Sequence, residues 1–410
     1  MDMDAASPES CLAVGLMSGT SLDGVDACVV EITEPTEPGN PPKLRMVGFF
    51  TRPYPEGLRG DLTALCVSGT VTELCRYNAL LGRVFADAAQ EVVSGCGLSM
   101  DQISVIGSHG QTVHHLPSPT LLHGYTISST LQIGDSSIIA NHCRVTTVGD
   151  FRGADMAVGG QGAPLVPYLD EIILRSRLEE TGRVGLLLNI GGISNISALT
   201  THRGNDERDV TLLGFDCGPG NVLIDTLMKK WFDCDFDRDG EMALTGKTSI
   251  ELLDYLMKDE FIFRQPPKST GREYYGEAYL DSPLTKMDKL HIARKDVIAT
   301  LSEFTAAVVW KNYQLFIEPH FQRGAAGYDL YVSGGGAKNA AIMRALERRF
   351  EGFKVSTTKE IGIDPDAKEA LCFALLGYQT WRGRPTNVPS VTGAREQVIL
   401  GKVCPVVRTN

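Results

Sequence analysis

The sequence predicts a two-domain α/β protein whose related domains face each other across a cleft. The chain has 410 residues, which is more than one ordinary hydrophobic core organises. Short apolar segments at 11–17, 184–190 and 330–333 each run into a glycine-rich turn, and helical segments follow them. This recurring order of strand, glycine turn and helix indicates a duplicated α/β domain. The duplication is inferred from element order, because the two halves share little sequence.

The individual elements follow from apolar periodicity and turn residues. After a lead of ten residues expected to be disordered, strands are predicted at 11–17, 26–32, 44–52 and 103–107, and a helix at 71–95. The second half gives strands at 184–190 and 330–333 and a helix that ends near Arg348. We expect an N-terminal domain formed by 11–145 and about 383–410, and a second domain formed by about 146–382.

Composition and charge exclude several functional classes. The formal net charge is −11, which argues against non-specific binding to nucleic acid or to an anionic membrane. The sequence has no apolar stretch of the ~18 residues that a membrane span needs, and its acidic start differs from a signal peptide. Its ten cysteines are scattered without a Cys-x-x-Cys pair, as expected of free thiols in a reducing compartment. We therefore expect a cytoplasmic protein.

The first glycine-rich turn, residues 15–24, has the sequence Gly-Leu-Met-Ser-Gly-Thr-Ser-Leu-Asp-Gly. It combines the hydroxyls of Thr20 and Ser21 with the carboxylates of Asp23 and, just beyond it, Asp26. Exposed backbone N–H groups and hydroxyls suit phosphate oxygens, and an adjacent carboxylate can hold a sugar hydroxyl. The pattern is neither a Walker A loop nor a dinucleotide fingerprint. It predicts a phosphate site, and a plain hairpin turn is the alternative.

Three further charged positions each allow two interpretations. Arg152 follows Asp150 and precedes a glycine-rich stretch, so it either forms a loop ion pair or orients a polyhydroxyl or phosphate ligand. Asp216 ends an apolar segment, where it either caps the following helix or acts as a general base. Glu369 lies in a first helical turn, where its residue type alone favours an interaction with the helix dipole over a Mg²⁺ contact.

The triple glycine at 334–336 suits close approach of a nucleotide.

Two patterns resemble metal sites. His109 and the pair His114–His115 lack a third ligand at suitable spacing, so a metal site is not favoured there. Asp235, Asp237 and Asp239 begin like a calcium loop, but Gly246 stands where the twelfth-position Glu is required. A solvated turn is therefore the expectation for residues 235–239.

Taken together, these residues resemble the anhydro-N-acetylmuramic acid kinase family. The similar segments run in order from residue 12 to about 402, and their length and order make chance agreement remote. They are 15–26, 107–112, 131–135, 150–167, 189–195, 214–221, 266–273, 333–339 and 367–370.

The resemblance implies two actin/hexokinase-like (ribonuclease H-like) domains that flank an active-site cleft, with ATP and Mg²⁺ as cofactors. In this family, water opens a 1,6-anhydro ring at the anomeric carbon while O6 takes the γ-phosphoryl group of ATP. The product from anhydro-N-acetylmuramic acid is N-acetylmuramic acid 6-phosphate. The N-terminal domain would carry the first phosphate loop and the sugar contacts, and the second domain the catalytic Asp and further glycine loops.

The matching positions assign roles to individual residues. Asp216 would activate the water and contact the metal, Asp23 and Arg152 would hold the sugar, and Glu369 would help to place Mg²⁺. The residues expected around the nucleotide and its phosphates are Gly19, Thr20, Ser21, Leu22, Asp23, Gly24, Val25, Asp26, Gly191, Gly192, Gly218, Gly334, Gly335 and Gly336.

The substrate and the assembly are less constrained. Leu16–Ser18 and Gly159–Gln161 look like the muramic acid enzymes, but an insertion at Thr120–Ser129 and Met242, where that group usually has Trp, depart from them. Levoglucosan kinase is therefore the alternative. A phosphoanhydride hydrolase and a non-catalytic sugar or nucleotide sensor are alternatives of another class; the presence of Asp216 and Glu369 argues against the sensor. Family relatives are often dimers, so a homodimer is compatible with the resemblance.

Overall fold

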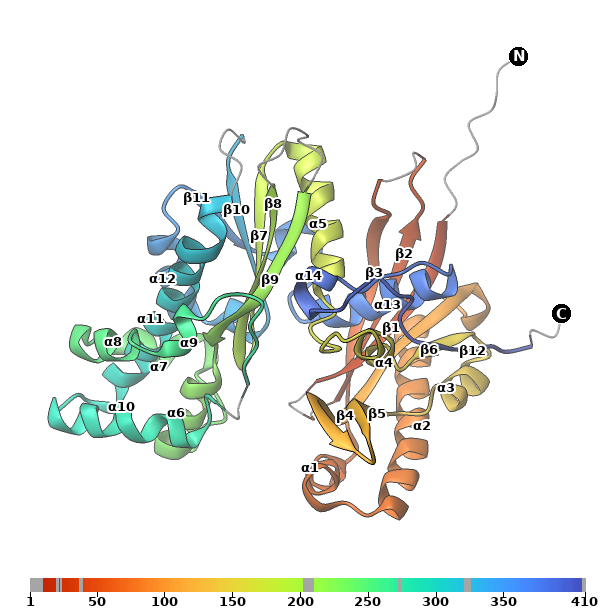
Figure 1. The fold of residues 1–410 in the computed structure, drawn as a ribbon, viewed down its shortest axis with the longest axis horizontal. Helices are drawn as coiled ribbons and strands as arrows, with labels where there is room; N and C mark the ends of the chain where they lie inside the picture. Colours follow the sequence, from red (N-terminus) through yellow and green to blue (C-terminus); the bar gives the residue numbers. More distant parts are fainter. Residues whose placement is uncertain are drawn as a thin grey trace. The chain divides into compact units, whose positions relative to one another are not determined.

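The computed structural model describes residues 10–19, 22, 24–36, 40–201, 210–271, 274–320 and 326–407. The chain divides into two compact units: unit 1 is Met1–Ile172 with Ala367–Asn410, and unit 2 is Ile173–Asp366. The chain therefore passes from unit 1 to unit 2 after Ile172 and returns to unit 1 after Asp366, whereas boundaries near 145 and 383 were expected. Figure 1 shows the elements of both units, which are described one at a time below.

Unit 1 is built on a seven-stranded sheet with the order β12-β6-β4-β1-β2-β3, and β5 pairs with β4 beside this path. The pairs β1–β2 and β2–β3 are antiparallel, whereas β1–β4 and β4–β6 are parallel. The strands are β1 (Ser10–Ser18), β2 (Gly24–Thr33), β3 (Lys43–Pro53), β4 (Ile103–Leu122), β5 (Tyr125–Ile133), β6 (Thr147–Gly149) and β12 (Lys402–Cys404). The helices are α1 (Leu58–Ser68), α2 (Val71–Gly95), α3 (Ser136–Cys143), α4 (Arg152–Ala157), α13 (Lys368–Trp381) and α14 (Pro389–Thr392), with a 3₁₀ turn, η1 (Met100–Gln102).

Unit 2 contains a five-stranded sheet with the order β11-β10-β7-β8-β9. Its strands are β7 (Val184–Ile190), β8 (Ile193–Thr201), β9 (Val210–Pro219), β10 (Tyr328–Ser333) and β11 (Phe353–Thr357). Helix α5 (Pro167–Thr181) runs across the unit boundary. The other α-helices are α6 (Val222–Phe232), α7 (Glu241–Thr245), α8 (Ile250–Leu256), α9 (Glu260–Phe263), α10 (Glu277–Lys289), α11 (Arg294–Asn312) and α12 (Ala340–Arg349). Shorter helical turns are η2 (Arg238–Gly240), η3 (Tyr313–Ile317), η4 (Glu318–His320), η5 (Gly335–Lys338) and η6 (Thr358–Ile361).

The two sheets have the same topology. In each, the first strand pairs antiparallel with the second and the second with the third, and the first pairs parallel with a fourth strand that pairs parallel with a fifth. The strands β1, β2, β3, β4 and β6 thus correspond to β7, β8, β9, β10 and β11. The predicted duplication and the predicted α/β fold class, with two ribonuclease H-like domains, are confirmed.

Glycines explain why the late helix α13 belongs to unit 1. A Cβ at Gly15 would lie 1.9 Å from the Ala370 carbonyl oxygen, and one at Gly107 would lie 1.8 Å from that of Phe373. The missing side chains on β1 and β4 therefore let α13 lie directly against the sheet. Because neighbouring strand residues face opposite sides, Val14, Leu16 and Ile106 point to the other face and pack in a buried cluster with residues of α2.

Strand β4 is longer than the sequence predicts, and it forms a hairpin with β5. The expected strand at 103–107 continues to Leu122, and β5 pairs with it from Gln111 opposite Ile133 to Leu122 opposite Tyr125. His123 and Gly124 turn the chain with φ of 49° and 85°. Two consecutive residues with positive φ match the twist of a tight hairpin. The Thr120–Ser129 insertion is thus the tip of this hairpin.

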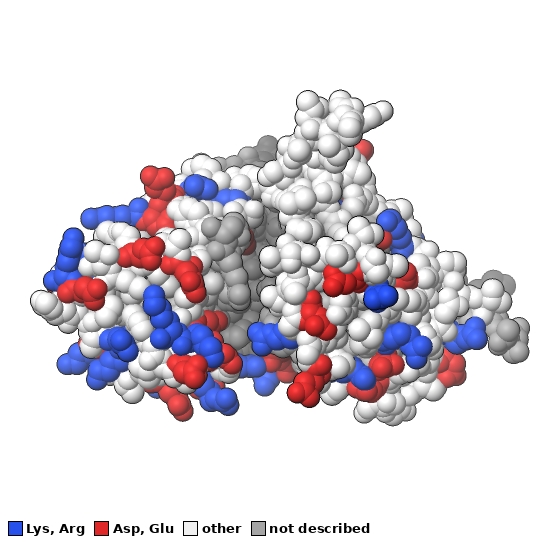
Figure 2. All heavy atoms as spheres, turned by 90° about the horizontal axis from the view of Figure 1, so that it is seen from below, with Lys and Arg blue, Asp and Glu red and all other residues white. Residues whose placement is uncertain are grey.

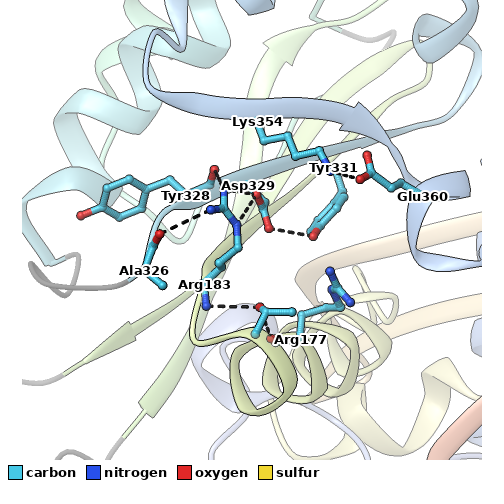
Figure 3. A network of polar contacts seen from close by, with 9 residues as sticks. Arg177, Arg183, Ala326, Tyr328, Asp329, Tyr331, Lys354 and Glu360 are labelled. Atoms are coloured by element: carbon cyan, nitrogen blue, oxygen red, sulfur yellow. Dashed lines mark hydrogen bonds and ion pairs between the residues drawn. The ribbon is translucent and has the colours of Figure 1, made fainter.

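Unit 2 has a polar network around the buried Asp329, where β7 and β10 begin (Figure 3). Arg183 Nε donates to Asp329 Oδ1 at 2.9 Å, and the Tyr331 hydroxyl donates to Asp329 Oδ2 at 2.9 Å. Arg183 Nη2 also donates to the Tyr328 carbonyl at 2.9 Å. Asp329 is buried, so these bonds compensate the cost of desolvating its charge. The network joins the start of β10 to that of β7.

Candidate active site

The first glycine turn of unit 1 is braced at both ends. The Ser18 hydroxyl, at the end of β1, lies 2.7 Å from the Gly24 carbonyl and 2.7 Å from Gln111 Oε1, and it accepts a hydrogen bond from the Tyr54 hydroxyl at 2.7 Å. Gln111 Nε2 is 3.4 Å from the Gly19 carbonyl. Ser18 and Gln111 are buried. Ser18 of β1, Gln111 of β4 and Tyr54, which directly follows β3, thereby fix the points where the turn leaves and rejoins the sheet.

The turn itself is shorter than expected, because β1 extends to Ser18 and β2 begins at Gly24. Gly24 packs against the Arg52 carbonyl oxygen, which a Cβ would approach to 2.3 Å. Val25 is fully buried in the unit 1 core, and Asp26 accepts a hydrogen bond from the Thr51 hydroxyl at 2.6 Å. Leu22 has φ of 54°. The predicted positions Thr20, Ser21 and Asp23 lie outside the described residues.

Arg152 begins α4 and is held by a histidine. Its Nε and Nη2 lie 3.1 and 2.8 Å from His109 Nε2, and its Nη1 donates to the Gly162 carbonyl at 2.7 Å. His109 Nδ1 lies 2.9 Å from the Gly110 carbonyl, so this nitrogen carries the proton and Nε2 accepts. Burial, followed by the Arg152 charge, lowers the pKa of His109 well below its usual value. Burial likewise lowers the pKa of Arg152 to about 10. From the sequence, a metal site at His109 was not favoured, and the contact between His109 and Arg152 was not predicted.

The interpretation of Asp150 and Arg152 as an ion pair is wrong. Asp150 instead pairs with Lys402, at 2.9 Å, on the neighbouring strand β12. The carboxylate of Asp155, which was not predicted as a site residue, is buried. It accepts hydrogen bonds from the Gly162 N–H at 2.8 Å, the Asn387 amide at 2.9 Å and the Thr392 hydroxyl at 2.7 Å. These bonds tie the glycine-rich stretch after Arg152 to the C-terminal part of the chain.

Glu369 lies in the first turn of α13 and is partly buried. Among the described residues its carboxylate forms no hydrogen bond or ion pair, although the charges of Arg152 and Lys368 act on it. Burial raises the pKa of Glu369, and these two cations oppose that effect. The neighbouring Lys368 is occupied by a buried ion pair with Asp170, at 2.7 Å. A carboxylate without a protein hydrogen bond fits a contact to Mg²⁺, which proteins hold through one or two carboxylates and substrate phosphates.

Asp216, the predicted general base, belongs to unit 2. It lies within β9, six positions before α6 begins, and Asn221 is the N-cap residue of that helix. The helix-cap interpretation of Asp216 is therefore wrong. Its backbone N–H donates to the Lys268 carbonyl at 3.1 Å, and its Oδ2 accepts from the Thr270 N–H at 2.9 Å. The segment 268–270 thus fixes both the backbone and the carboxylate of Asp216.

The predicted glycine turns of unit 2 contact one another at the ends of its strands. The backbone N–H groups of Gly220, Asn221 and Val222 donate to the carbonyls of Gly191 and Gly192 at 2.8 to 3.1 Å. Gly334 has φ of 77°, and a Cβ there would lie 2.7 Å from the Ile190 carbonyl oxygen. Gly336 would place a Cβ 2.3 Å from the Ile190 side chain. Gly218 is buried in β9 against Val308, whereas Gly335 is exposed.

The two metal-like patterns have structural roles. Asp237 is buried rather than solvated, and its carboxylate accepts the N–H groups of Met242 and Ala243 at 2.8 and 3.0 Å at the start of α7. Met242, the position that departs from the muramic acid group, packs against the unit 2 core. His115 Nδ1 lies 3.0 Å from the Thr130 hydroxyl within the β4–β5 hairpin. The solvated-turn prediction for 235–239 is therefore wrong for Asp237.

Comparison with known proteins identifies the family of this chain. The family model described as anhydro-N-acetylmuramic acid kinase matches residues 11–406. The chain belongs to this family. It is 40% identical over 399 residues to the anhydro-N-acetylmuramic acid kinase of Caldanaerobacter subterraneus subsp. tengcongensis, covering 96% of this chain and 97% of the relative. It is also 40% identical over 394 residues to the Salinibacter ruber enzyme of that name, covering 95% of each.

The family predicted from the sequence is therefore confirmed, and with it the phosphotransferase class. Solved structures with similar folds include a gluconate kinase from Lactobacillus acidophilus, with a TM-score of 0.42 and 11% identity, covering 96% of this chain and 94% of that one. A hexokinase from Schistosoma mansoni complexed with glucose has a TM-score of 0.36 and 13% identity, covering 90% and 86%. Similarity at these levels carries no information about substrate.

Proposed function

We propose that this chain is an ATP-dependent kinase that converts anhydro-N-acetylmuramic acid, ATP and water to N-acetylmuramic acid 6-phosphate and ADP. The observation that carries the proposal is the fixed carboxylate of Asp216, held at its backbone and at Oδ2 by segment 268–270, in a chain of this family. Asp216 takes a proton from water as the water oxygen bonds to the anomeric carbon. The bond from that carbon to O6 breaks, and O6 takes the γ-phosphoryl group as ADP leaves.

The remaining roles are proposals of the same kind. Arg152, whose guanidinium is oriented by His109, and Asp23 bind the sugar. In unit 1, residues Gly19–Asp26 are proposed to line the phosphate site. In unit 2, the glycine turns Gly191–Gly192, Gly218 and Gly334–Gly336 are proposed to let the nucleotide approach the backbone closely. Glu369 in unit 1 is proposed as a ligand of Mg²⁺, and Asp216 in unit 2 is proposed as a further metal contact. When bound, Mg²⁺ would neutralise the charge of the transferring phosphoryl group.

The direct test replaces Asp216 by Asn, which keeps the size of the side chain and removes its basicity. Turnover measured by coupled ADP release is expected to fall about 10²-fold or more, while ATP binding, measured by calorimetry, stays unchanged. Asp254→Asn, at an exposed position of α8 in the same unit, is the control and should keep full activity. Normal turnover by Asp216→Asn would remove the base role.

The same assay separates the substrate alternatives. Anhydro-N-acetylmuramic acid is expected to give the highest kcat/KM, ahead of levoglucosan and of glucose. Equal ADP release with and without any sugar would instead indicate a phosphoanhydride hydrolase, and binding of both ligands without turnover would indicate a sensor. Preference for levoglucosan would identify the other anhydrosugar kinase of the resemblance.

A cytoplasmic location and a homodimer are also proposed. None of the described helices has the length and apolarity needed to cross a membrane, and acidic and basic side chains are interspersed on the face in Figure 2.

Within the described sheet, β5 pairs with β4 alone, and residues 116–133 contain no Lys, Arg, Asp or Glu. The edge strand β3, by contrast, carries Lys43, Arg45 and Arg52.

An uncharged edge strand is open to pairing with another strand, and a second copy of this acidic chain would meet little repulsion there. We therefore propose pairing of β5 with β5 of a second copy. Ile127→Lys should lower the mass measured by analytical ultracentrifugation from dimer to monomer. A dimer that survives this change, or a monomeric wild-type protein, would contradict the proposal.

A further inference from the structure

Lys268 occupies an unusual position in unit 2. Its ammonium group donates to the carbonyls of Phe261 and Ile262, at 3.0 and 3.1 Å, near the end of α9. It also lies over three aromatic rings, 4.8 Å from the centroid of Phe261, 5.0 Å from that of Phe316 and 5.6 Å from that of Phe215. In the described part of the chain it forms no ion pair within 4 Å. A cation is therefore held by carbonyl dipoles and ring faces rather than by a carboxylate.

The same residue begins the segment that holds Asp216. The Lys268 carbonyl accepts the Asp216 backbone N–H at 3.1 Å, and two residues later the Thr270 N–H donates to Asp216 Oδ2 at 2.9 Å. Phe215, one of the rings beneath the ammonium, directly precedes Asp216 in β9. The side chain of Lys268 thus anchors to α9 a segment whose backbone fixes the carboxylate.

We propose that Lys268 is a positioning residue for Asp216: its anchored side chain holds segment 268–270, and with it the carboxylate of Asp216, in place. This proposal rests on the proposed role of Asp216 as base. A general base must lie within hydrogen-bond reach of the proton that it takes, so the position of the carboxylate decides how well it acts. Lys268 acts through Asp216 and is not itself proposed to touch the substrate.

The charges around Lys268 are consistent with this role. Burial lowers the pKa of Lys268 to about 8, while Cys217, Asp216 and Asp259 raise it and Arg264 lowers it further. Asp216 and Cys217 lie on β9, and Asp259 and Arg264 flank α9. Below pH 8, Lys268 is a cation, so its ammonium group is charged when it donates to the carbonyls of α9.

Two substitutions separate charge from packing. Lys268→Met keeps an unbranched apolar chain among the rings but removes the ammonium, whereas Lys268→Arg keeps the charge. We expect Lys268→Met to lower kcat about tenfold or more while the KM values for anhydrosugar and ATP stay constant, because only the position of the base changes. Lys268→Arg keeps a charged donor and should retain most of the wild-type kcat. Lys258→Met, at an exposed position in the same unit, is the control and should match the wild type.

Different results would contradict the positioning role of Lys268 and the base role of Asp216. If Asp216→Asn abolishes turnover but Lys268→Met has the wild-type kcat, Lys268 has no positioning role. Equal losses of kcat and Tm in Lys268→Met and Lys268→Arg would show that Lys268 only stabilises the fold. Should Asp216→Asn itself retain turnover, the proposed base falls, and with it the reason for positioning.

Discussion

Arg152 directs two N–H groups at a single nitrogen of His109, its Nε at 3.1 Å and its Nη2 at 2.8 Å. This contact requires a neutral imidazole, since a doubly protonated ring has no acceptor. The depressed pKa of His109 satisfies that requirement, because the ring gains a second proton only well below pH 6.5. The histidine therefore acts as a fixed acceptor that orients the guanidinium.

Replacing His109 by Ala should weaken sugar binding through loss of this orientation. A hydrogen bond to a charged group contributes about 1.5–3 kcal/mol, so the KM for anhydrosugar should rise about tenfold or more while the KM for ATP stays constant. Steady-state kinetics with each substrate varied in turn measures this. His142→Ala, at an exposed histidine of α3, is the control. Unchanged sugar KM in His109→Ala would contradict the role.

Glu369→Gln should separate activity from stability. The variant removes the proposed Mg²⁺ contact, so kcat should fall about 10²-fold and the Mg²⁺ concentration for half-maximal activity should rise. The folded pKa of Glu369 is raised by burial, so the folded state binds more protons above pH 4.5 and the carboxylate lowers stability as pH rises. The amide lacks that cost, and the Tm at pH 7 should equal or exceed that of the wild type. A variant with full activity or with a clearly lower Tm would contradict this prediction.

Gly334→Ala tests the nucleotide turn of unit 2. The new Cβ would meet both the Ile190 carbonyl oxygen at 2.7 Å and Asn189 Oδ1 at 2.8 Å, in a backbone with φ of 77°. Gly352→Ala is a matched control, because its φ is 90° but its Cβ meets nothing within 4 Å. Both variants should lose about 1–3 kcal/mol from backbone strain, measured by urea unfolding. A rise in the KM for ATP is expected for Gly334→Ala alone, and equal behaviour of the two would exclude the turn from the nucleotide site.

Asp329→Asn should weaken the network in Figure 3 in a pH-dependent way. Burial opposes ionisation of Asp329, but the bonds from Arg183 and Tyr331 prevail and lower its pKa. A lowered folded pKa stabilises the protein above pH 3.8, and this stabilisation is lost as pH falls through the folded value. The variant should therefore be less stable by about 1–3 kcal/mol at pH 7, and the difference should shrink toward pH 3. Thermal unfolding across this range measures it, and a constant difference would contradict the assignment.

The α/β class, the duplicated order of strands and the helix over α2 could be predicted because they depend on local periodicity and turn residues. The unit boundaries could not. Gly15 and Gly107 read as turn or motif residues along the chain, whereas they are the sites where α13 lies on the sheet. That contact joins segments more than 250 residues apart, and no local pattern reports it. The observed boundaries also place Arg152 and Glu369, which the sequence assigned to the second domain, in unit 1.

The sequence by itself determined the family. It also identified Asp216, Arg152 and Glu369 as candidate site residues, because the family motifs that contain them can be recognised from the order of residues along the chain. Only the tertiary structure decided the partners of these residues. Arg152 contacts His109 rather than Asp150, and Asp216 is held by segment 268–270 rather than capping α6. Hydrogen bonds and buried charges depend on which distant segments share a strand edge or a helix face. That choice is made by packing, which sequence spacing does not encode.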